Sequence, residues 1–591
     1  MAENDRSAET KEHSGEKARI PELLSPAGSP AALEAALEAG ADAVYCGGTL
    51  FNARMNAHNF GDDELRYAAE ACHSAGARLY VTLNTQLYDR ELIKALRFAD
   101  FLCGISVDGV IAADIGLCSM IHRYIPQLPL HASTQMSGAN TAQAVWLSER
   151  GFTRMVCARE LSKKDIERLC ASSPIEIEMF AHGAHCVSVS GQCEFSAMVG
   201  RRSGNRGECA QPCRMAYNGG YPLSLKDMCL AGHISELCGI GVASLKIEGR
   251  MKSPDYVRGV TSVYRRLLDE RRDADEAETE YLAALFSRGG FTDGYYAEKI
   301  RPSMLGVRSE GDKAATGAVK AGKSAAVIPD YIPKKKEPVT VVREPSSLPE
   351  NIDIPASELS QPRGMSAEFT SASQIPKKHP FGLVCLPLSA FRASDAGKAN
   401  CVILPPVIYD REAEEVLRRL KEALGSGIKH VMITNAGQIE LIRPLMSDDI
   451  TLHGGWRLNV FNSASLSELI SCGLADCLLS PELTLPQARD IKGPKRLTVC
   501  GRIPLMICEK PVGAKTLVDR VGARFPVVRI DGRDIILNSG ITYMGDRQQE
   551  LKKNGISALH FIFTDETPGE VTALLDAWRR ELSPDFRVRR V

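Results

Sequence analysis

The chain has 591 residues, of which 44% are hydrophobic and 25% charged, and its formal net charge is −1 at pH 7. This length exceeds what one hydrophobic core serves and predicts several domains, while the near-neutral charge excludes binding of nucleic acid through overall charge alone. No apolar run approaches the roughly 20 residues of a membrane-spanning helix, so no membrane partner is expected.

The N-terminal residues 1–20 are polar and charged, and they lack the apolar segment of a secretory signal. This composition predicts a disordered tail. The chain also holds 18 cysteines. Without an export signal, such cysteines indicate a reducing compartment, where burial or metal binding is favoured over disulfides. We therefore expect a cytoplasmic protein.

Short apolar runs alternate with helix-length segments through the first half of the chain. Eight runs are present, at 22–28, 43–48, 79–85, 109–114, 128–133, 154–160, 175–183 and 242–250. Ser29 and Pro30 fit the N-cap and first position of the first intervening helix. Eight strand–helix units predict an α/β fold, a TIM-like (β/α)8 barrel over residues 21–304. An open doubly wound sheet is the alternative.

Polar residues follow most of these runs, and in a barrel they would meet at the face where active sites form. They are Ser25, Tyr45, Asn84, Asp114, His131, Ser133, Gln135, Arg159, Glu160, His182, Lys246, Glu248 and Arg250. Among them, His131, Glu160 and His182 are the candidates for proton transfer.

The same face carries candidates for holding an anionic substrate. Arg159, Lys246 and Arg250 can bind carboxylate or phosphate through charge-assisted hydrogen bonds, and Glu248 lies between them in sequence. The alternative is structural: Arg159 with Glu160, and Lys246 with Glu248, would then form ion pairs on the rim.

The connection between the seventh and eighth runs, residues 183–241, is far longer than a βα connection needs. It contains five cysteines: Cys186, Cys193, Cys209, Cys213 and Cys229. Their spacing does not match the paired CxxC of common zinc modules. Thiolates gathered on one loop suit an iron–sulfur cluster, which needs four of them. The alternative is that they pack as small buried hydrophobic residues.

Positive charge accompanies the cysteines in this loop. The basic residues are Arg201, Arg202, Arg206, Arg214 and Lys226. They suit an anionic partner, and they could equally balance the negative charge of a cluster. If RNA binds, we expect contact through the Arg201–Arg214 patch.

The C-terminal half reads as a diverged copy of the first. Residues 305–380 are rich in Lys, Pro, Ser and Glu and predict a linker or small accessory module. Strand-like runs then resume over 381–591. His131 matches His453 and Glu160 matches Glu482 at one offset of 322 residues, but the cysteine set is not repeated. We predict a degenerate, non-catalytic barrel-like domain that docks substrate or pairs with the first barrel.

Three long strings carry a family resemblance: IEIEMFAHGAHCVSVSGQC, the upstream ELLSPAGSPAALEAALEAGADAVYCGG and the downstream SLKIEGRMKSPDYV. Over about residues 20–300 the chain resembles the peptidase U32 family, the collagenase-like peptidases. The resemblance implies either a peptidase or a hydroxylase. Some members place a 5-hydroxyl on a tRNA uridine or a 23S rRNA cytidine, with prephenate implicated as oxygen source. Others hydroxylate the ubiquinone ring with a cysteine-held 4Fe–4S cluster.

Carried over by motif, the resemblance implies a 4Fe–4S cluster on Cys186, Cys193, Cys209 and Cys229. Some relatives use the second cysteine of a CxxxC pair, which would select Cys213 in place of Cys229. The long duplicated form looks like the rRNA-modifying branch.

Neither an HExxH zinc motif nor a GxSxG elbow supports the peptidase reading. Of the activities that the resemblance implies, we expect that of an iron–sulfur enzyme that hydroxylates a pyrimidine of rRNA or tRNA, with a donor such as prephenate. A collagenase-like peptidase is the alternative. A non-catalytic module that binds RNA or protein is the second alternative.

Overall fold

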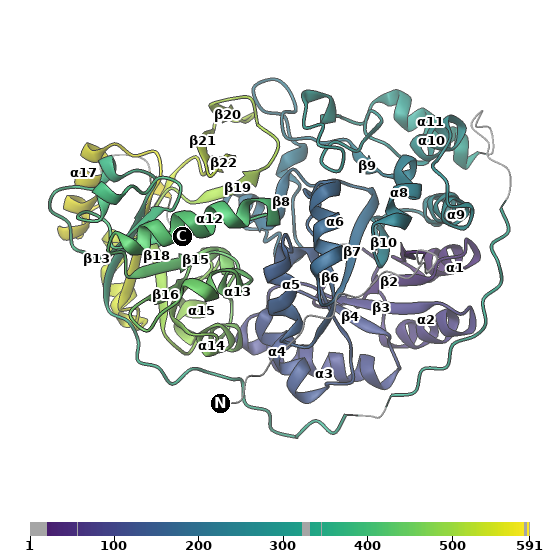
Figure 1. Cartoon of the computed structure of the whole chain (residues 1–591), viewed down its shortest axis with the longest axis horizontal. Coiled ribbons are helices and arrows are strands. Elements are labelled where there is room, and N and C mark those ends of the chain that lie inside the picture. The colour runs from purple at the N-terminus through teal and green to yellow at the C-terminus, as the bar shows by residue number, and fades with distance from the viewer. Residues whose placement is uncertain (1–19, 56, 322–330, 344–345, 584–587, 590–591) are drawn as a thin grey trace, which may run out of the picture.

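A computed structural model describes residues 20–55, 57–321, 331–343, 346–583 and 588–589. The predicted tail, apart from Ile20, lies outside the described residues. Two barrels lie side by side, the first in purple to blue and the second in green to yellow (Figure 1). Among the described residues, none of the helices combines the length and apolar character that crossing a membrane requires.

The first barrel is closed, as predicted, and the open-sheet alternative is wrong. Its parallel strands are β1 (Glu22–Pro26), β2 (Ala43–Gly47), β3 (Arg78–Leu83), β4 (Gly109–Ala112), β5 (Leu130–Ala132), β6 (Phe152–Val156), β7 (Glu176–Gly183) and β10 (Ser244–Ile247). Closure comes from β10, which pairs with both β1 and β7. The strands are almost fully buried because helices cover the sheet outside and side chains fill it inside.

Helices of the first barrel form the outer ring (Figure 1). They are α1 (Pro30–Glu38), α2 (Asp62–Ser74), α3 (Asp89–Gly104), α4 (Ile115–Tyr124), α5 (Thr141–Ser148), α6 (Lys163–Ser172), α8 (Ile234–Gly239) and α9 (Pro254–Glu270). The predicted cap is present: the Ser29 side chain accepts a hydrogen bond from the Ala32 amide, and Pro30 opens α1.

The long seventh connection is an insertion with its own structure. It contains β8 (Ser188–Cys193), α7 (Phe195–Gly200) and β9 (Asp227–Cys229). Strand β9 runs antiparallel to β7 and pairs on its other side with β11 (Phe291–Thr292). The insertion thus leaves the barrel at β8 and returns to it at β9.

The second half is also a closed barrel of eight parallel strands. These are β12 (Gly364–Phe369), β13 (Phe381–Pro387), β14 (Cys401–Ile403), β15 (His430–Ile433), β16 (Thr451–Gly454), β17 (Leu474–Leu478), β18 (Lys495–Gly501) and β24 (Ala558–Phe563). The helices after β12 and β13 are reduced to single 3-10 turns, Ala372–Gln374 and Ala393–Asp395. The later helices are α12 (Asp410–Gly425), α13 (Gln438–Ile442), α14 (Ser463–Ser471), α15 (Leu485–Asp490), α16 (Gln548–Lys553) and α17 (Pro568–Arg579).

The second barrel begins inside the segment assigned to the linker, because β12 starts at Gly364 rather than after 380. Before it, α10 (Glu276–Leu285) packs against α11 (Glu310–Lys320). Residues 331–343 and 346–363 then run extended along the outside of the first barrel and reach the second, where Gln361 contacts the Gly493 carbonyl; they are seen as the teal stretch in Figure 1. The Lys336 ammonium fastens this stretch, 2.6 Å from Asp42 and 2.8 Å from the Ala41 carbonyl.

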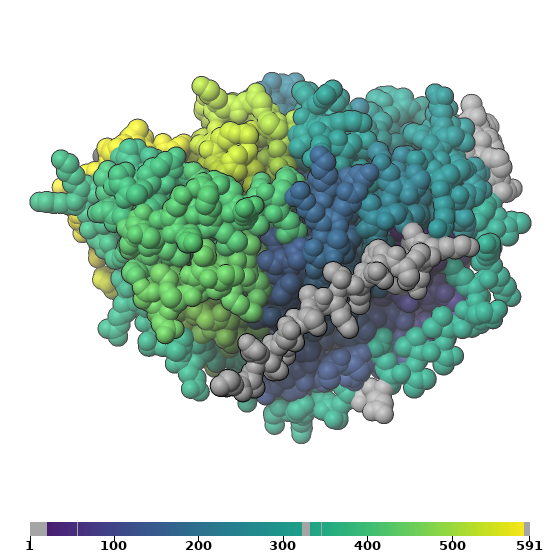
Figure 2. Space-filling model, viewed as in Figure 1, coloured from purple at the N-terminus to yellow at the C-terminus, as the bar shows by residue number. Residues whose placement is uncertain are grey.

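The two barrels pack through a pseudo-two-fold arrangement, in which equivalent elements of each barrel contact the other reciprocally. Helix α4 packs on α14, and the equivalent pair, α5 on α13, packs reciprocally. The Asn140 amide donates to the Ile408 carbonyl at 2.6 Å, and its counterpart Asn462 donates to the Leu87 carbonyl at 2.8 Å. On the face shown in Figure 2 the two halves meet along a continuous seam.

The insertions after the seventh strands extend this pairing. In the second barrel the insertion holds β19 (Pro504–Cys508), β20 (Thr516–Val518), β21 (Arg524–Ile530), β22 (Arg533–Leu537) and β23 (Ile541–Tyr543). Strand β19 runs antiparallel to β8, so one five-stranded sheet joins the two barrels. The cysteine-rich segment is therefore held between both halves.

Candidate functional site

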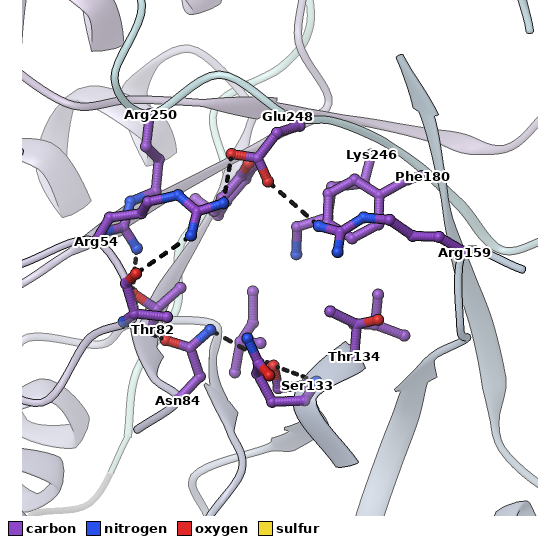
Figure 3. A pocket seen from close by; sticks show the side chains of 15 residues that line it. Arg54, Thr82, Asn84, Ser133, Thr134, Arg159, Phe180, Lys246, Glu248 and Arg250 are labelled. Carbon is purple, nitrogen blue, oxygen red and sulfur yellow. Dashed lines mark hydrogen bonds and ion pairs between the residues drawn. The ribbon is translucent and has the colours of Figure 1, made fainter. Parts of the chain in front are cut away.

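A pocket opens at the carboxyl ends of the first barrel's strands (Figure 3). Strands β2, β3, β4, β6, β7 and β10 contribute to its wall, and it encloses about 470 Å³ of space, part of it open to solvent. This is the face where (β/α)8 barrels place their active sites. Of the predicted residues, Tyr45, Asn84, Ser133, Gln135, Arg159, Lys246, Glu248 and Arg250 line it.

Glu248 lies between two guanidinium groups in this pocket (Figure 3). Its carboxylate oxygens are each 3.4 Å from a guanidinium nitrogen, one on Arg54 and one on Arg159. Burial disfavours the charge of Glu248, but Arg54, Arg159 and Arg250 outweigh burial and lower its pKa. The carboxylate therefore stays ionised and fixes Arg54 and Arg159 across the pocket.

Lys246 and Arg250 have different partners from those expected. The Lys246 ammonium is 2.8 Å from Glu178, not Glu248, and lies 4.3 Å from the centre of the Tyr45 ring. Burial lowers the pKa of Lys246. The predicted rim pair between Lys246 and Glu248 is thus absent among the ion pairs of the described residues.

Arg250 is held by neutral oxygens. Its guanidinium donates to the Thr82 hydroxyl at 2.7 Å and to the side-chain carbonyl of Asn59 at 3.3 Å, and it also bonds Asn52. Neutral partners leave its charge uncompensated at close range. With Arg54, Arg159 and Lys246 beside it, the pocket carries an excess of positive charge that suits a small anion.

The three proton-transfer candidates do not line this pocket. His131 lies inside the barrel, its ring 4.7 Å from that of Tyr80, where burial, Arg154 and Lys246 lower its pKa. His182 lies among Tyr264 and Phe291, and burial lowers its pKa to about 3. Both are neutral rings packed against aromatic side chains.

Glu160 serves the insertion rather than the pocket. Its carboxylate accepts a hydrogen bond from the Ser190 amide at 2.5 Å and so holds β8. Burial raises the pKa of Glu160 to about 7. The predicted pair with Arg159 is also replaced, because Arg159 bonds Glu248 and stacks 4.1 Å from the Phe180 ring centre.

Four of the five loop cysteines share one neighbourhood. Burial raises the pKa of the Cys193 thiol well above its usual value, and Cys186, Cys209 and Cys213 raise it further. Burial likewise raises the pKa of Cys213 to about 12, with Cys186 and Cys209 adding to the effect. Cys209 is exposed and the other three are half-buried. These four thiols are close enough to act on each other's charge.

The structure does not bring Cys229 to the other predicted ligands. Its sulfur is 3.8 Å from the Tyr264 hydroxyl, and it packs against the core of the first barrel. Cys193 and Cys213 instead pack against a separate apolar cluster shared with the second barrel. Because β9 pairs antiparallel with β7, Cys229 is directed toward α9.

The cysteine group borders the cationic pocket. The Cys209 thiol is among the groups that raise the pKa of Arg54, after Glu248, and the charge of Arg159 opposes the rise that burial causes in the pKa of Cys186. Gly207 lies against the Asn52 carbonyl and the Met55 side chain, so the two loops touch. Among the described residues, no three His, Cys, Asp or Glu side chains already stand at metal-ligand geometry.

The predicted basic patch is only partly on the surface. Arg206 pairs with Glu91 at 2.9 Å and lies 3.9 Å from the Tyr88 ring centre. Arg214 donates to the His185 carbonyl at 2.8 Å. These two arginines hold the insertion in place, whereas Arg201 and Arg202 are exposed.

Comparison with known proteins places the chain in a family. The sequence profile of peptidase family U32 matches residues 28–304. The chain is 34% identical over 306 residues to a collagenase of Porphyromonas gingivalis, covering 46% of this chain and 73% of that protein. The chain belongs to peptidase family U32.

Two further relatives in this family are named for RNA hydroxylation. The chain is 41% identical over 279 residues to a 23S rRNA 5-hydroxycytidine synthase of Escherichia coli (strain K12), covering 44% of this chain and 42% of that protein. It is 36% identical over 266 residues to the tRNA hydroxylation protein P1 of Bacillus subtilis (strain 168), covering 42% and 63%. The match thus spans less than two thirds of either relative.

Proposed function

We propose that this chain is an iron–sulfur-dependent hydroxylase that places a hydroxyl on C5 of a pyrimidine in rRNA or tRNA. The observation that carries the proposal is the position of the cysteine group, which borders a cationic pocket at the active face of the barrel. The names of the RNA-hydroxylating relatives support the same reaction class.

Cys186, Cys193, Cys209 and Cys213 would hold a 4Fe–4S cluster. Their donor chemistry fits, since four thiols gather on one loop, and burial, with the neighbouring thiols adding to it, raises the pKa values of Cys193 and Cys213. When bound, such a cluster supplies an electron relay or a Lewis acid beside the pocket.

The chain's own residues would bind and orient a small hydroxyl donor with carboxylate groups, such as prephenate. Arg250 and Lys246 offer charge from the pocket floor, and Arg54 and Arg159 offer it from the sides, positioned by Glu248. Charge-assisted hydrogen bonds of this kind fix both position and orientation.

The peptidase alternative finds less support in this pocket. The described residues that line it include neither a histidine nor a cysteine, so neither a Cys–His nor a Ser–His pair lines it. The name of the collagenase relative is what keeps this alternative open.

The test is the loss of a modified nucleoside. In a strain that lacks the gene, mass spectrometry of digested RNA should show loss of 5-hydroxycytidine or 5-hydroxyuridine. The intact gene should restore it and a Cys186→Ser variant should not. Unchanged levels of both nucleosides would refute the proposal. Cleavage of gelatin by purified protein would favour the peptidase. If the nucleosides are unchanged and gelatin is not cleaved, the non-catalytic binding module is the alternative that is left.

A further inference from the structure

The second barrel carries its own pocket at the equivalent face. The ends of β12, β13, β14, β15 and β24 contribute to it, together with the turn after β21, and it encloses about 650 Å³ of space. Part of that space is open to solvent. At the repeat offset of 322 residues, Trp456 and Arg457 of this pocket correspond to Thr134 and Gln135 of the first.

The lining of this second pocket is aromatic rather than cationic. The rings of Phe369 and Phe563 stack with centroids 5.0 Å apart. Trp456 forms another part of the wall, with the Arg457 guanidinium 4.2 Å from its ring centre. Walls of this kind bind flat, apolar or heteroaromatic groups.

Open hydrogen-bonding groups lie among these rings. Among the described residues, the Glu368 carboxylate has no closer polar partner than His560 Nε2, 3.9 Å away, and that nitrogen is itself buried without a hydrogen bond. One oxygen of Asp531 is also buried without a partner in the described part of the chain. Arg457 adds a donor: besides its contact with Trp456, it donates to Gln192 Oε1 at 3.4 Å, and the charges of Glu368 and Asp531 act on it. Two acceptor groups and one donor thus face a flat slot.

We propose that this pocket binds a nucleobase that carries an exocyclic amino group, such as cytosine. The amino group would donate to the Glu368 carboxylate, the ring acceptors would accept from the Arg457 guanidinium, and the ring would lie against Phe369 and Trp456. Carboxylates accept from the cytosine amino group, whereas uracil presents an acceptor at that position and is disfavoured. Aromatic side chains hold unstacked RNA bases in this way.

The source of that base is the RNA substrate, so this part rests on the proposed function. A third cavity lies between the barrels, and it shares Gln135 with the first pocket and Thr434 and Arg457 with the second. Gln143 Oε1 and Asn459 Oδ1 line it and are buried without partners among the described residues. The three cavities therefore adjoin one another through shared lining residues, from the first pocket to the second.

The experiment is calorimetric titration of the full-length protein, loaded with its iron, with cytidine and with uridine. Cytidine should bind saturably and uridine at least fivefold more weakly. Glu368→Gln should reduce that preference at least threefold, and Ile403→Phe, which fills the slot, should abolish binding. Glu415→Gln, an exposed carboxylate on α12, is the matched control and should bind as the natural protein does. No saturable binding of cytidine, or an unchanged preference in Glu368→Gln, would overturn the proposal.

A second arm separates RNA from free nucleosides. At one fixed salt concentration, Ile403→Phe should bind an unmodified 23S rRNA transcript at least fivefold more weakly than the natural protein. If the variant loses cytidine but keeps the transcript, the RNA source is wrong. The proposed function is tested separately: unchanged levels of hydroxynucleosides in the deletion strain would refute it. That result would not change the outcome of the cytidine titration.

Discussion

At the scale of single residues, the pocket of the first barrel is organised around cations whose partners differ. Arg54 and Arg159 share the carboxylate of Glu248, whereas Arg250 has only hydroxyl and amide oxygens as partners. A buried charge without a directly bonded counter-ion is costly, so Arg250 is the group whose position a bound anion would stabilise most.

Under the proposed function, replacing Arg250 should therefore act on binding of the anionic hydroxyl donor. In Arg250→Met, we expect the KM for the anionic donor to rise by about 10- to 100-fold, the loss expected for a hydrogen bond to a charged group. The check is the rate of RNA hydroxylation against donor concentration. Arg520→Gln, an exposed arginine of the second half, is the control. An unchanged KM would mean that the anion binds elsewhere.

The fourth ligand can be decided by a matched pair of cysteines. Cys213 shares the neighbourhood of Cys186 and Cys193, while Cys229 contacts Tyr264. We expect Cys213→Ser to lose iron, measured after anaerobic purification, and Cys229→Ser to keep it. The reverse pattern would restore the ligand set that the sequence alone implied.

His182 predicts a dependence of stability on pH. Its pKa is about 3 in the folded protein because it is buried, below the roughly 6.5 of an exposed histidine. The unfolded chain therefore binds the extra proton first, and stability falls as pH drops below about 6.5. Near pH 5 the cost is on the order of 2 kcal/mol.

The measurement compares denaturant unfolding at pH 7 and pH 5. His182→Phe should lose less stability between the two pH values than the natural protein, because it has no imidazole to protonate. The exposed His58, replaced by Gln, serves as control and should leave the difference unchanged. Equal pH effects in His182→Phe and the natural protein would contradict the assignment.

At the scale of elements, two glycines in equivalent positions set the contact between barrels. A Cβ on Gly116 would lie 2.5 Å from the Ser465 amide nitrogen, and one on Gly437 would lie 2.5 Å from the Gln143 Cα. Both neighbours belong to the first turn of a helix in the other barrel. The close approach on both sides follows from the pseudo-two-fold arrangement.

Gly437→Ala should accordingly destabilise the seam between the barrels. Overpacking against backbone typically costs about 1–3 kcal/mol, so the unfolding midpoint should fall. Gly104→Ala, at the end of α3 with open space around it, should leave stability unchanged or raise it. If the unfolding midpoint of Gly437→Ala equals that of Gly104→Ala, the backbone at the contact between the barrels can shift to accommodate the added methyl group at little cost in stability.

The pattern of apolar residues explains which strands could be predicted from the sequence and which could not. The eight strands of the first barrel were found because they are short, nearly continuous apolar runs, which is how strands buried on both faces read. Strand β12, GMSAEF, was missed because it mixes glycine, serine and glutamate with few large apolar residues. The polar residues at strand ends predicted most of the pocket for the same topological reason.

The positions of side chains that depend on loop conformation, on strand pairing or on packing against aromatic rings could not be predicted from the sequence. Arg54 comes from the loop after β2, and its distance in sequence from the end of that strand does not predict that its side chain lines the pocket. Cys229 lies in the same loop sequence as the other cysteines, and only the pairing of β9 with β7 turns it away. His131 and His182 belong to strands, but their side chains pack against aromatic rings rather than lining the pocket.

At the scale of the whole molecule, the insertions make the two halves one unit. An apolar cluster joins Val187, Phe195 and Met198 of the first half with Leu505 and Phe525 of the second. Strand β19 pairs with β8 on one side and β22 on the other. Separation would expose both this cluster and a sheet edge, and each is a strong cause of association.

The halves should therefore recombine when the chain is cut. Residues 20–343 and 346–583, produced as two polypeptides, should form a stoichiometric complex with a Kd below about 1 µM, as expected for a large apolar interface. The second half alone should self-associate through its open β19 edge, which light scattering would detect. Lys or Glu in place of Met506, whose backbone pairs with Cys193, should weaken the complex because the charge would be buried in the apolar cluster. If both halves stay monomeric and do not bind each other, the seam contributes little and the cysteine-rich segment is held by the first barrel alone.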